Sequence, residues 1–324
     1  MPDTLPPPLP LFPPIEPYQT GSLKVSDSHE LYYECSGNRD GQPVLFLHGG
    51  PGTGSSPDTR RLFDPSRCNI VQFDQRGCGA STPHGSLIEN TTDHLVGDMI
   101  KLLDQLNIEK AHLAGGSWGS TLALAFAMKH QNRVRSILIY GIFLCRASEF
   151  KALYFEGGVV SQIYPEVFAN FIELLPPDER SDPIKGYAKL FQSDNIELRN
   201  EALHMWTLLE QQASRLIVDQ KRLQTEMANP DYVLSHSLIE NHYFRQNGFL
   251  DGDQLLAVVG KKLANIPTRI INGRYDLICP MITAHELHKA MPHSLLTIVP
   301  DAGHSFRDPG MFDAIIRASN ELHG

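Results

Sequence analysis

The chain has 324 residues, of which 41% are hydrophobic, and it carries a net charge of −9 at pH 7. With the glycines added, the apolar share is typical of folded globular proteins and excludes disorder as the main state. The length suits about two domains, or one large α/β unit with an insertion. Because the net charge is negative and no run of like charges occurs, we expect neither nucleic acid nor a membrane as a partner.

The cysteines are odd in number and include no C-x-x-C pair; they are Cys35, Cys68, Cys78, Cys145 and Cys279. This spacing predicts neither a disulfide framework nor a zinc site and is typical of a reducing compartment. No basic residue precedes Lys24, so the N-terminus lacks the pattern of a signal peptide. The longest apolar stretch, residues 137–145, is well below the ~20 residues of a membrane helix. We therefore expect a soluble, cytoplasmic protein.

Residues 1–20 are rich in proline, and we expect them to form an extended tail. From residue 21, short apolar runs closed by turn residues alternate with helical patterns, which predicts a parallel sheet covered by helices. The expected strands are residues 22–25, 30–35, 44–47, 69–73, 111–114 and 134–140, and the expected helices are residues 92–106 and 120–130.

The alternation stops near residue 144, and residues 144–256 are rich in aromatic residues and mostly helical in pattern. We expect this segment to be an inserted cap domain. Strand patterns return at residues 268–272 and 295–299, and a last helix is expected from about residue 309 to residue 322. The domain that contains the sheet would then comprise residues 21–143 and 257–324. The fold class predicted is α/β, with a mostly parallel central sheet, helices on both faces and an inserted, mainly helical cap.

The strongest motif is G-G-S-W-G at residues 115–119, which lies directly after an expected strand and directly before an expected helix. A serine at such a sharp turn presents its hydroxyl group, and glycines are needed around it because a Cβ would clash with nearby backbone. The helix N-terminus that follows favours developing negative charge. Ser117 is therefore the predicted nucleophile.

A second glycine motif, H-G-G-P-G at residues 48–52, follows the expected strand at residues 44–47. Glycines let the backbone of this loop come close to a substrate carbonyl group. We expect the amide groups of Gly50 and Trp118 to form a two-donor oxyanion hole.

An activated serine needs a histidine base and an acid that orients it, and on this type of turn the acid and the histidine follow later in the chain. Asp276 ends the segment after one late strand, and His304 follows the next strand. Loops at the carboxyl ends of strands are where such a site belongs. Asp301 and Asp253 are weaker alternatives for the acid.

Together these motifs resemble the proline iminopeptidase (prolyl aminopeptidase) family of α/β-hydrolases. The resemblance covers nearly the whole chain and includes residues 46–52, 74–79, 115–120, 141–143, 273–276 and 302–305. It implies the α/β-hydrolase fold and a serine exopeptidase that releases proline from small peptides with N-terminal proline. Epoxide hydrolases and haloalkane dehalogenases share part of the pattern, but they use an aspartate where Ser117 stands.

The resemblance also implies three substrate-binding residues. Glu210 and Glu240, in the expected cap, match the two glutamates that hold the free amino end of the substrate in this family. Phe143 matches an aromatic residue that packs on the proline ring, although a phenylalanine after a core strand can also belong to the core. The chain departs from the family at Leu209, where tryptophan is usual, which bears on pocket shape and substrate preference.

The predicted reaction needs no cofactor and no metal. The spacing H-E-x-H at residues 285–288 is not the H-E-x-x-H of a zinc helix. The nearest alternative function is an esterase or amidase of the same fold with relaxed acyl specificity. A non-catalytic receptor on the same scaffold is disfavoured by the complete set of Ser117, Asp276 and His304. No oligomeric state is predicted.

Overall fold

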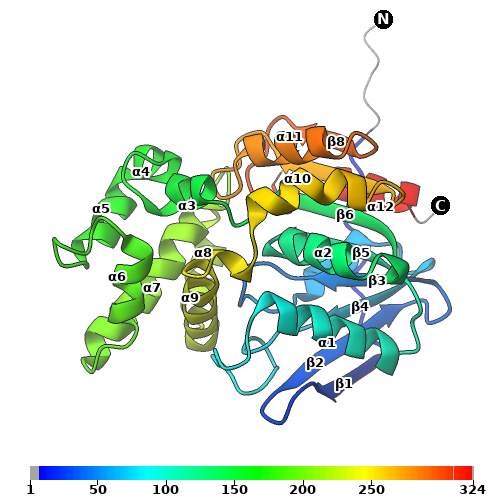
Figure 1. Ribbon diagram of the computed structural model, residues 1–324, viewed down its shortest axis with the longest axis horizontal. Helices are drawn as coiled ribbons and strands as arrows, with labels where there is room; N and C mark the ends of the chain where they lie inside the picture. Colours follow the sequence, from blue (N-terminus) through cyan, green and yellow to red (C-terminus); the bar gives the residue numbers. More distant parts are fainter. Residues whose placement is uncertain (1–6, 309, 323–324) are drawn as a thin grey trace, which may run out of the picture.

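The computed structural model describes residues 7–308 and 310–322 (Figure 1). One eight-stranded sheet forms its centre, with the strand order β1-β2-β4-β3-β5-β6-β7-β8. The strands are β1 (Gln19–Lys24), β2 (Glu30–Gly37), β3 (Gln42–Leu47), β4 (Cys68–Phe73), β5 (Ala111–Ser117), β6 (Val134–Ile142), β7 (Thr268–Gly273) and β8 (Leu295–Val299). Neighbouring strands from β4 to β8 in this order are parallel, and β1 and β2 add an antiparallel edge.

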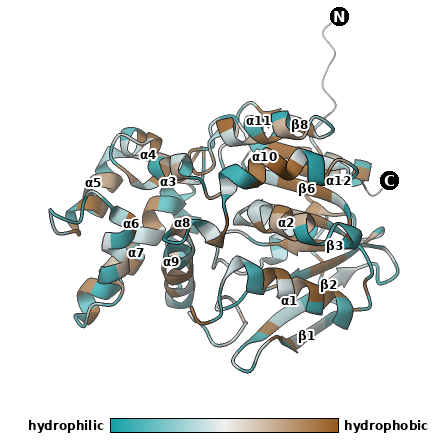
Figure 2. Ribbon diagram, in the orientation of Figure 1, coloured by the Kyte–Doolittle hydropathy of each residue, from teal (hydrophilic) through white to brown (hydrophobic). Residues whose placement is uncertain are grey.

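Side chains of the central strands alternate between two hydrophobic cores, because successive residues of a strand point to opposite faces. Leu45 and Leu47 of β3 belong to the larger core, and Val44 and Phe46 belong to the smaller one. The larger core is covered by α1 (Thr92–Gln105), α2 (Trp118–Lys129), α10 (Gly252–Lys262) and α11 (Met281–Ala290). The smaller core is covered by η1 (Pro57–Leu62) and α12 (Met311–Leu322). In Figure 2 hydrophobic, brown segments gather in the sheet and in the helices against it. The predicted fold class is therefore confirmed.

Helices α3 to α9 follow β6 and lie beside the sheet, at the left of Figure 1. They are α3 (Ala147–Tyr154), α4 (Val159–Ile163), α5 (Pro165–Glu173), α6 (Pro183–Leu190), α7 (Ile196–Ala213), α8 (Gln220–Met227) and α9 (Pro230–Phe244). The expected cap boundary between residues 256 and 257 falls inside α10, which begins at Gly252 after the cap residue Asp251 and packs against α2 and α11. We propose a cap that comprises α3 to α9 and ends before α10.

The described part of the expected tail, residues 7–20, lies against the sheet domain. Leu11 and Ile15 pack on the smaller core, and the Phe12 amide donates a hydrogen bond of 3.0 Å to the Arg61 carbonyl. The first strand begins at Gln19, inside the segment expected to be tail. Residues 1–6 lie outside the described residues. No helix in the described ranges combines the length and apolar character that crossing a membrane requires.

A buried ion pair ties the loop after β4 to α1. Both oxygens of Asp98 accept hydrogen bonds from Arg76, at 2.6 and 2.8 Å, and both side chains are almost completely buried. Removing one member of such a pair leaves an uncompensated buried charge.

We therefore expect Asp98→Ala to lower the free energy of unfolding in urea by about 3–5 kcal/mol. Asp104→Ala on the same helix is the matched control, because Asp104 forms an exposed ion pair with Arg133. This control should cost at most about 1 kcal/mol. Equal effects of the two substitutions would contradict the structural role of the buried pair.

Candidate active site

Ser117 lies at the junction of β5 and α2 in an unusual backbone conformation, with φ of 57° and ψ of −130°. The surrounding glycines permit this turn. A Cβ at Gly116 would lie 2.1 Å from the Tyr140 ring, and one at Gly119 would lie 2.2 Å from the carbonyl oxygen of Leu47. The strand extends to Ser117, further than the expected end at residue 114, because the glycine backbones still pair with β6. The side chain is thereby presented at the carboxyl edge of the sheet.

The loop after β3 brings its backbone close to this turn. A Cβ at Gly49 would lie 3.2 Å from Ser117 Cβ, and Gly50 has a φ of +98°. Trp118 is the first residue of α2, so its N–H has no acceptor within the helix. The amide groups of Gly50 and Trp118 thus belong to two segments that meet at Ser117.

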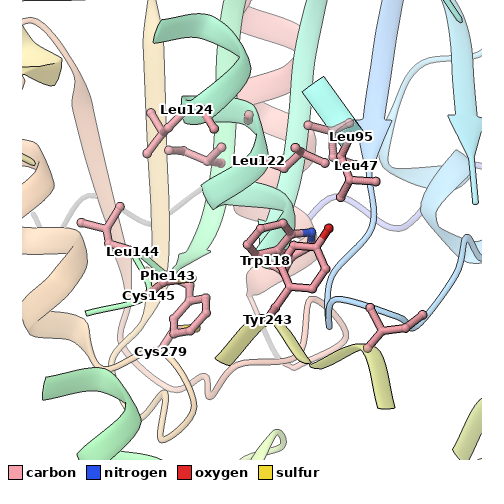
Figure 3. Close-up of a cluster of buried hydrophobic side chains, with 14 of the residues drawn as sticks. Leu47, Leu95, Trp118, Leu122, Leu124, Phe143, Leu144, Cys145, Tyr243 and Cys279 are labelled. Carbon is pink, nitrogen blue, oxygen red and sulfur yellow. The ribbon is translucent and has the colours of Figure 1, made fainter. Parts of the chain in front are cut away.

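Gln75 connects the two segments that carry these amides. Its side chain donates a hydrogen bond of 3.0 Å to the His48 carbonyl and accepts one of 2.9 Å from the Trp118 indole. His48 Nε2 accepts a hydrogen bond of 3.0 Å from the backbone N–H of Gln75. Burial lowers the pKa of His48, so this ring acts as a neutral acceptor. Figure 3 shows Trp118 against Tyr243, with ring centroids 4.8 Å apart.

Asp276 and His304 are hydrogen-bonded, with 2.9 Å between Asp276 Oδ2 and His304 Nδ1. The other oxygen of Asp276 accepts the amides of Ile278 and Cys279, at 3.0 and 2.7 Å. These bonds hold the carboxylate in one orientation. Burial alone would lower the pKa of His304, but the charge and hydrogen bond of Asp276 outweigh burial and raise it. The alternative acid Asp301 is exposed.

The loop that carries His304 is anchored to the segment after α7. The Gly303 amide and the Leu216 amide both donate to Asp308 Oδ2, at 2.7 and 3.1 Å. The Ser305 amide donates to the Ser214 carbonyl at 2.9 Å. These bonds fix the position of the histidine loop relative to the proposed cap.

Glu210 of α7 and Glu240 of α9 lie together in the interior and are 6% and 0% exposed. Glu240 Oε2 accepts hydrogen bonds from the Trp206 indole at 2.6 Å and from the Tyr154 hydroxyl at 3.2 Å. His236 Nε2 lies 3.5 Å from Glu210 Oε1 and 3.7 Å from Glu240 Oε1. Glu240 Oε1 and His236 Nε2 are buried, and an ionised Glu240 would leave both atoms without a hydrogen-bond partner among the described residues.

The two carboxyl groups share one negative charge. Burial and the charge of Glu210 raise the pKa of Glu240 well above its usual range. Burial also opposes ionisation of Glu210, but the nearby His236 and the hydrogen bond with Glu240 outweigh it and lower the pKa of Glu210. Glu240 therefore holds the proton and Glu210 the charge.

A small, mostly apolar cavity of about 10 Å³ is lined by Ser117 and both glutamates. Its lining residues are Gly50, Ser117, Phe143, Leu153, Glu210, Glu240, Phe244, Ile278 and Cys279. The Phe143 ring, labelled in Figure 3, packs edge-on against Phe244 with centroids 5.5 Å apart. Burial raises the pKa of Cys279 well above its usual value, so this thiol is not an activated nucleophile. A second, larger cavity of about 250 Å³ also contains Ser117, Glu210 and His304.

Two groups of side chains have the spacing that a metal ion would require. They are Asp276, Cys279 and His304, and Glu210, His236 and Glu240, with ligand atoms within 4.8 Å of one another in each group. Hydrogen bonds or close contacts already join members of each group.

The family model of the alpha/beta hydrolase fold matches residues 42–308. The chain is 45% identical to a proline iminopeptidase of Arabidopsis thaliana over 96% of this chain and 82% of that protein. It is 43% identical to a proline iminopeptidase of Xylella fastidiosa over 96% of this chain and 99% of that protein. The chain belongs to the proline iminopeptidase family of α/β-hydrolases.

Solved structures share the α/β-hydrolase fold of this chain. The proline iminopeptidase of Mycobacterium smegmatis has a TM-score of 0.62 at 18% identity, covering 94% of this chain and 99% of that chain. A bromoperoxidase from Bacillus anthracis has a TM-score of 0.65 at 18% identity, covering 94% of this chain and 99% of that chain. At such identities these structures show the α/β-hydrolase fold alone.

Most of the predicted site residues line one or both cavities, namely Gly50, Ser117, Phe143, Glu210, Glu240 and His304. Asp276 and Trp118 line neither cavity; Asp276 is hydrogen-bonded to His304, and Trp118 directly follows Ser117. Three further side chains contact the glutamates but were not predicted as site residues: His236, Tyr154 and Trp206. His236 and Glu240 are four residues apart on α9, and this helical spacing could have pointed to His236. Tyr154 lies on a different helix, and only packing brings it to the pair.

The hydrogen bond between Asp276 and His304 predicts a measurable change in the histidine. Because the Asp276 charge raises the pKa of His304, Asp276→Asn should lower that pKa, as followed by NMR titration of the imidazole nitrogens. Asp301→Asn is the control, since Asp301 is exposed, and it should leave the titration almost unchanged. A larger drop in Asp301→Asn would mean that the acid is misassigned.

Proposed function

We propose that this protein is a prolyl aminopeptidase, a serine exopeptidase that releases N-terminal proline from small peptides through an acyl-enzyme. The observation that carries the proposal is the small cavity lined by Ser117 and a buried pair of carboxyl groups. Relatives at 45% and 43% identity named proline iminopeptidase support it. The cytoplasmic location expected from the sequence stays a prediction.

The first half of the reaction forms the acyl-enzyme. His304 accepts the proton of the Ser117 hydroxyl through Nε2, because its Nδ1 is hydrogen-bonded to Asp276. Ser117 Oγ attacks the prolyl carbonyl carbon, and the carbonyl oxygen becomes an oxyanion. The amides of Gly50 and Trp118 stabilise that charge, and each such donor typically contributes ~10²–10³ in rate. Asp276 stabilises the imidazolium that forms.

The second half of the reaction releases the products. His304 donates its proton to the departing amine as the C–N bond breaks, leaving proline esterified to Ser117. A water molecule then gives a proton to His304 and attacks the ester carbonyl. Collapse of this intermediate returns the proton to Ser117 and releases free proline.

The buried carboxyl pair provides the selectivity for a free N-terminus. A prolyl N-terminus carries one positive charge with two N–H donors, and the pair of Glu210 and Glu240 carries one negative charge. Phe143 lies in the same cavity and packs on the proline ring in this proposal. Holding the amine in place sets the scissile carbonyl group over Ser117, which is a positioning effect on the rate.

Acetylation of the substrate amine tests the carboxyl pair. It removes the cation and leaves the buried acids without a partner, so we expect acetyl-prolyl arylamide to react ~10⁴–10⁵ times more slowly than prolyl arylamide. Glu210→Gln should lower kcat/KM for prolyl arylamide by about 10–100-fold. Glu240→Gln should cost less, because Glu240 already holds a proton and glutamine keeps a donor there.

Hydrolysis of a simple ester without an amine is the control for both variants and should be much less affected. Equal cleavage of the acetylated and free substrates would contradict the proposal. If the two glutamine variants lost kcat/KM equally on the simple ester and on prolyl arylamide, that result would also contradict the proposal. Either result would support an esterase or amidase with relaxed acyl specificity.

A further inference from the structure

Three arginines from separate segments line the larger cavity beside Ser117 and His304. Arg215 follows α7, Arg222 lies on α8, and Arg307 is three residues beyond His304. The reaction described above uses none of them. Their convergence is notable because the chain as a whole carries a net charge of −9.

Two acids neutralise these arginines only in part. Glu226 accepts hydrogen bonds from Arg215 Nη2, the shorter at 2.8 Å, and from Arg222 Nε at 2.7 Å. Asp58 accepts one from Arg307 Nη2 at 2.5 Å and lies 3.8 Å from Arg222 Nη1. Arg61 also lies 3.5 Å from Asp58, and the charged Glu210 lines the same cavity, so four positive charges face three negative charges and one positive charge remains in excess.

Several guanidinium N–H groups remain without an acceptor. Arg215 Nη1 is buried and has no hydrogen-bond partner within the described ranges, and its side chain is only 9% exposed. For Arg307, Asp58 is the sole hydrogen-bond acceptor of the guanidinium group in the described part of the chain. Burial, together with the charge of Arg222, lowers the pKa of Arg307, which an additional anion would oppose.

The position of this group fits the leaving side of the substrate. Glu210 and Glu240 both line the small cavity, whereas the larger cavity is lined by Glu210 and the three arginines, and Ser117 is common to both. Arg307 is close enough to Tyr140 for its charge to act on that hydroxyl, and the Tyr140 ring contacts the Gly116 backbone next to Ser117. A peptide attacked at Ser117 with its amine at the glutamates would extend its C-terminal part into the larger cavity.

We infer that Arg215, Arg222 and Arg307 form a subsite for the C-terminal carboxylate of short peptides with two or three residues. This inference rests on the proposed prolyl aminopeptidase activity. Guanidinium groups match carboxylates in geometry and charge. The site then has an acidic end for the amine and a basic end for the carboxylate, which together suit a zwitterionic peptide.

The test compares two peptide substrates, prolyl-alanine and prolyl-alanyl-alanine, each with the same peptide carrying a C-terminal amide. We expect prolyl-alanine, prolyl-alanyl-alanine or both to have kcat/KM at least about tenfold above the corresponding amide, which is the size of one charge-assisted hydrogen bond. The preference should decrease with added salt, because the cavity is open to solvent. Ratios near one for both lengths would overturn the subsite. Prolyl arylamide, which has no carboxylate, reports separately whether the proposed activity exists.

Substitutions then locate the effect. In Arg222→Gln and in Arg307→Gln, the ratio of acid to amide should fall towards one, and a ratio cancels any general loss of turnover. Arg135→Gln is the matched control, because Arg135 is exposed near the start of β6, away from the carboxyl edge of the sheet. Arg135→Gln should keep the same ratio of kcat/KM for the acid to kcat/KM for the amide as the unsubstituted protein. Unchanged ratios in both cavity variants, with unchanged unfolding midpoints, would overturn the assignment.

Discussion

The backbone at Ser117 is the constraint around which the site is arranged. A residue with φ of 57° and ψ of −130° is strained, and it persists only where its surroundings fix it. Gly116 and Gly119 fix it by bringing the Tyr140 ring and the Leu47 carbonyl against the turn. The same constraint extends to the histidine, because a Cβ at Gly141 would lie 2.9 Å from His304 Cε1. Close packing against glycine backbone therefore fixes the positions of both the nucleophile, Ser117, and its base, His304.

Electrostatic coupling connects this turn to the buried carboxyl pair. The charge of Glu210 contributes to the raised pKa of His304, and His304 in turn contributes to the lowered pKa of Glu210. A cationic amine bound at Glu210 offsets part of that negative charge. In our account, substrate binding therefore favours the neutral imidazole that can accept the Ser117 proton, so the same contact serves recognition and catalysis.

The sheet could be predicted because its strands are short apolar runs with turn residues at their ends, and the turn at Ser117 has a motif of adjacent residues. The end of the cap was less predictable, since α10 continues the helical pattern of the preceding segment but packs on the sheet domain. The contacts of Glu240 with Tyr154 and Trp206 depend on the packing of three helices. No spacing along the chain encodes such contacts, and the same holds for the arginines of the larger cavity.

Labelling with a fluorophosphonate tests whether an activated Ser117 lies beside a site for a charged prolyl amine. This reagent forms a bond between phosphorus and an activated serine oxygen and releases fluoride. Our account predicts one adduct, mapped by mass spectrometry to the peptide that contains Ser117. Prolinamide should slow the labelling, whereas N-acetylprolinamide should not. An adduct on another residue, or equal protection by the two amides, would contradict the account.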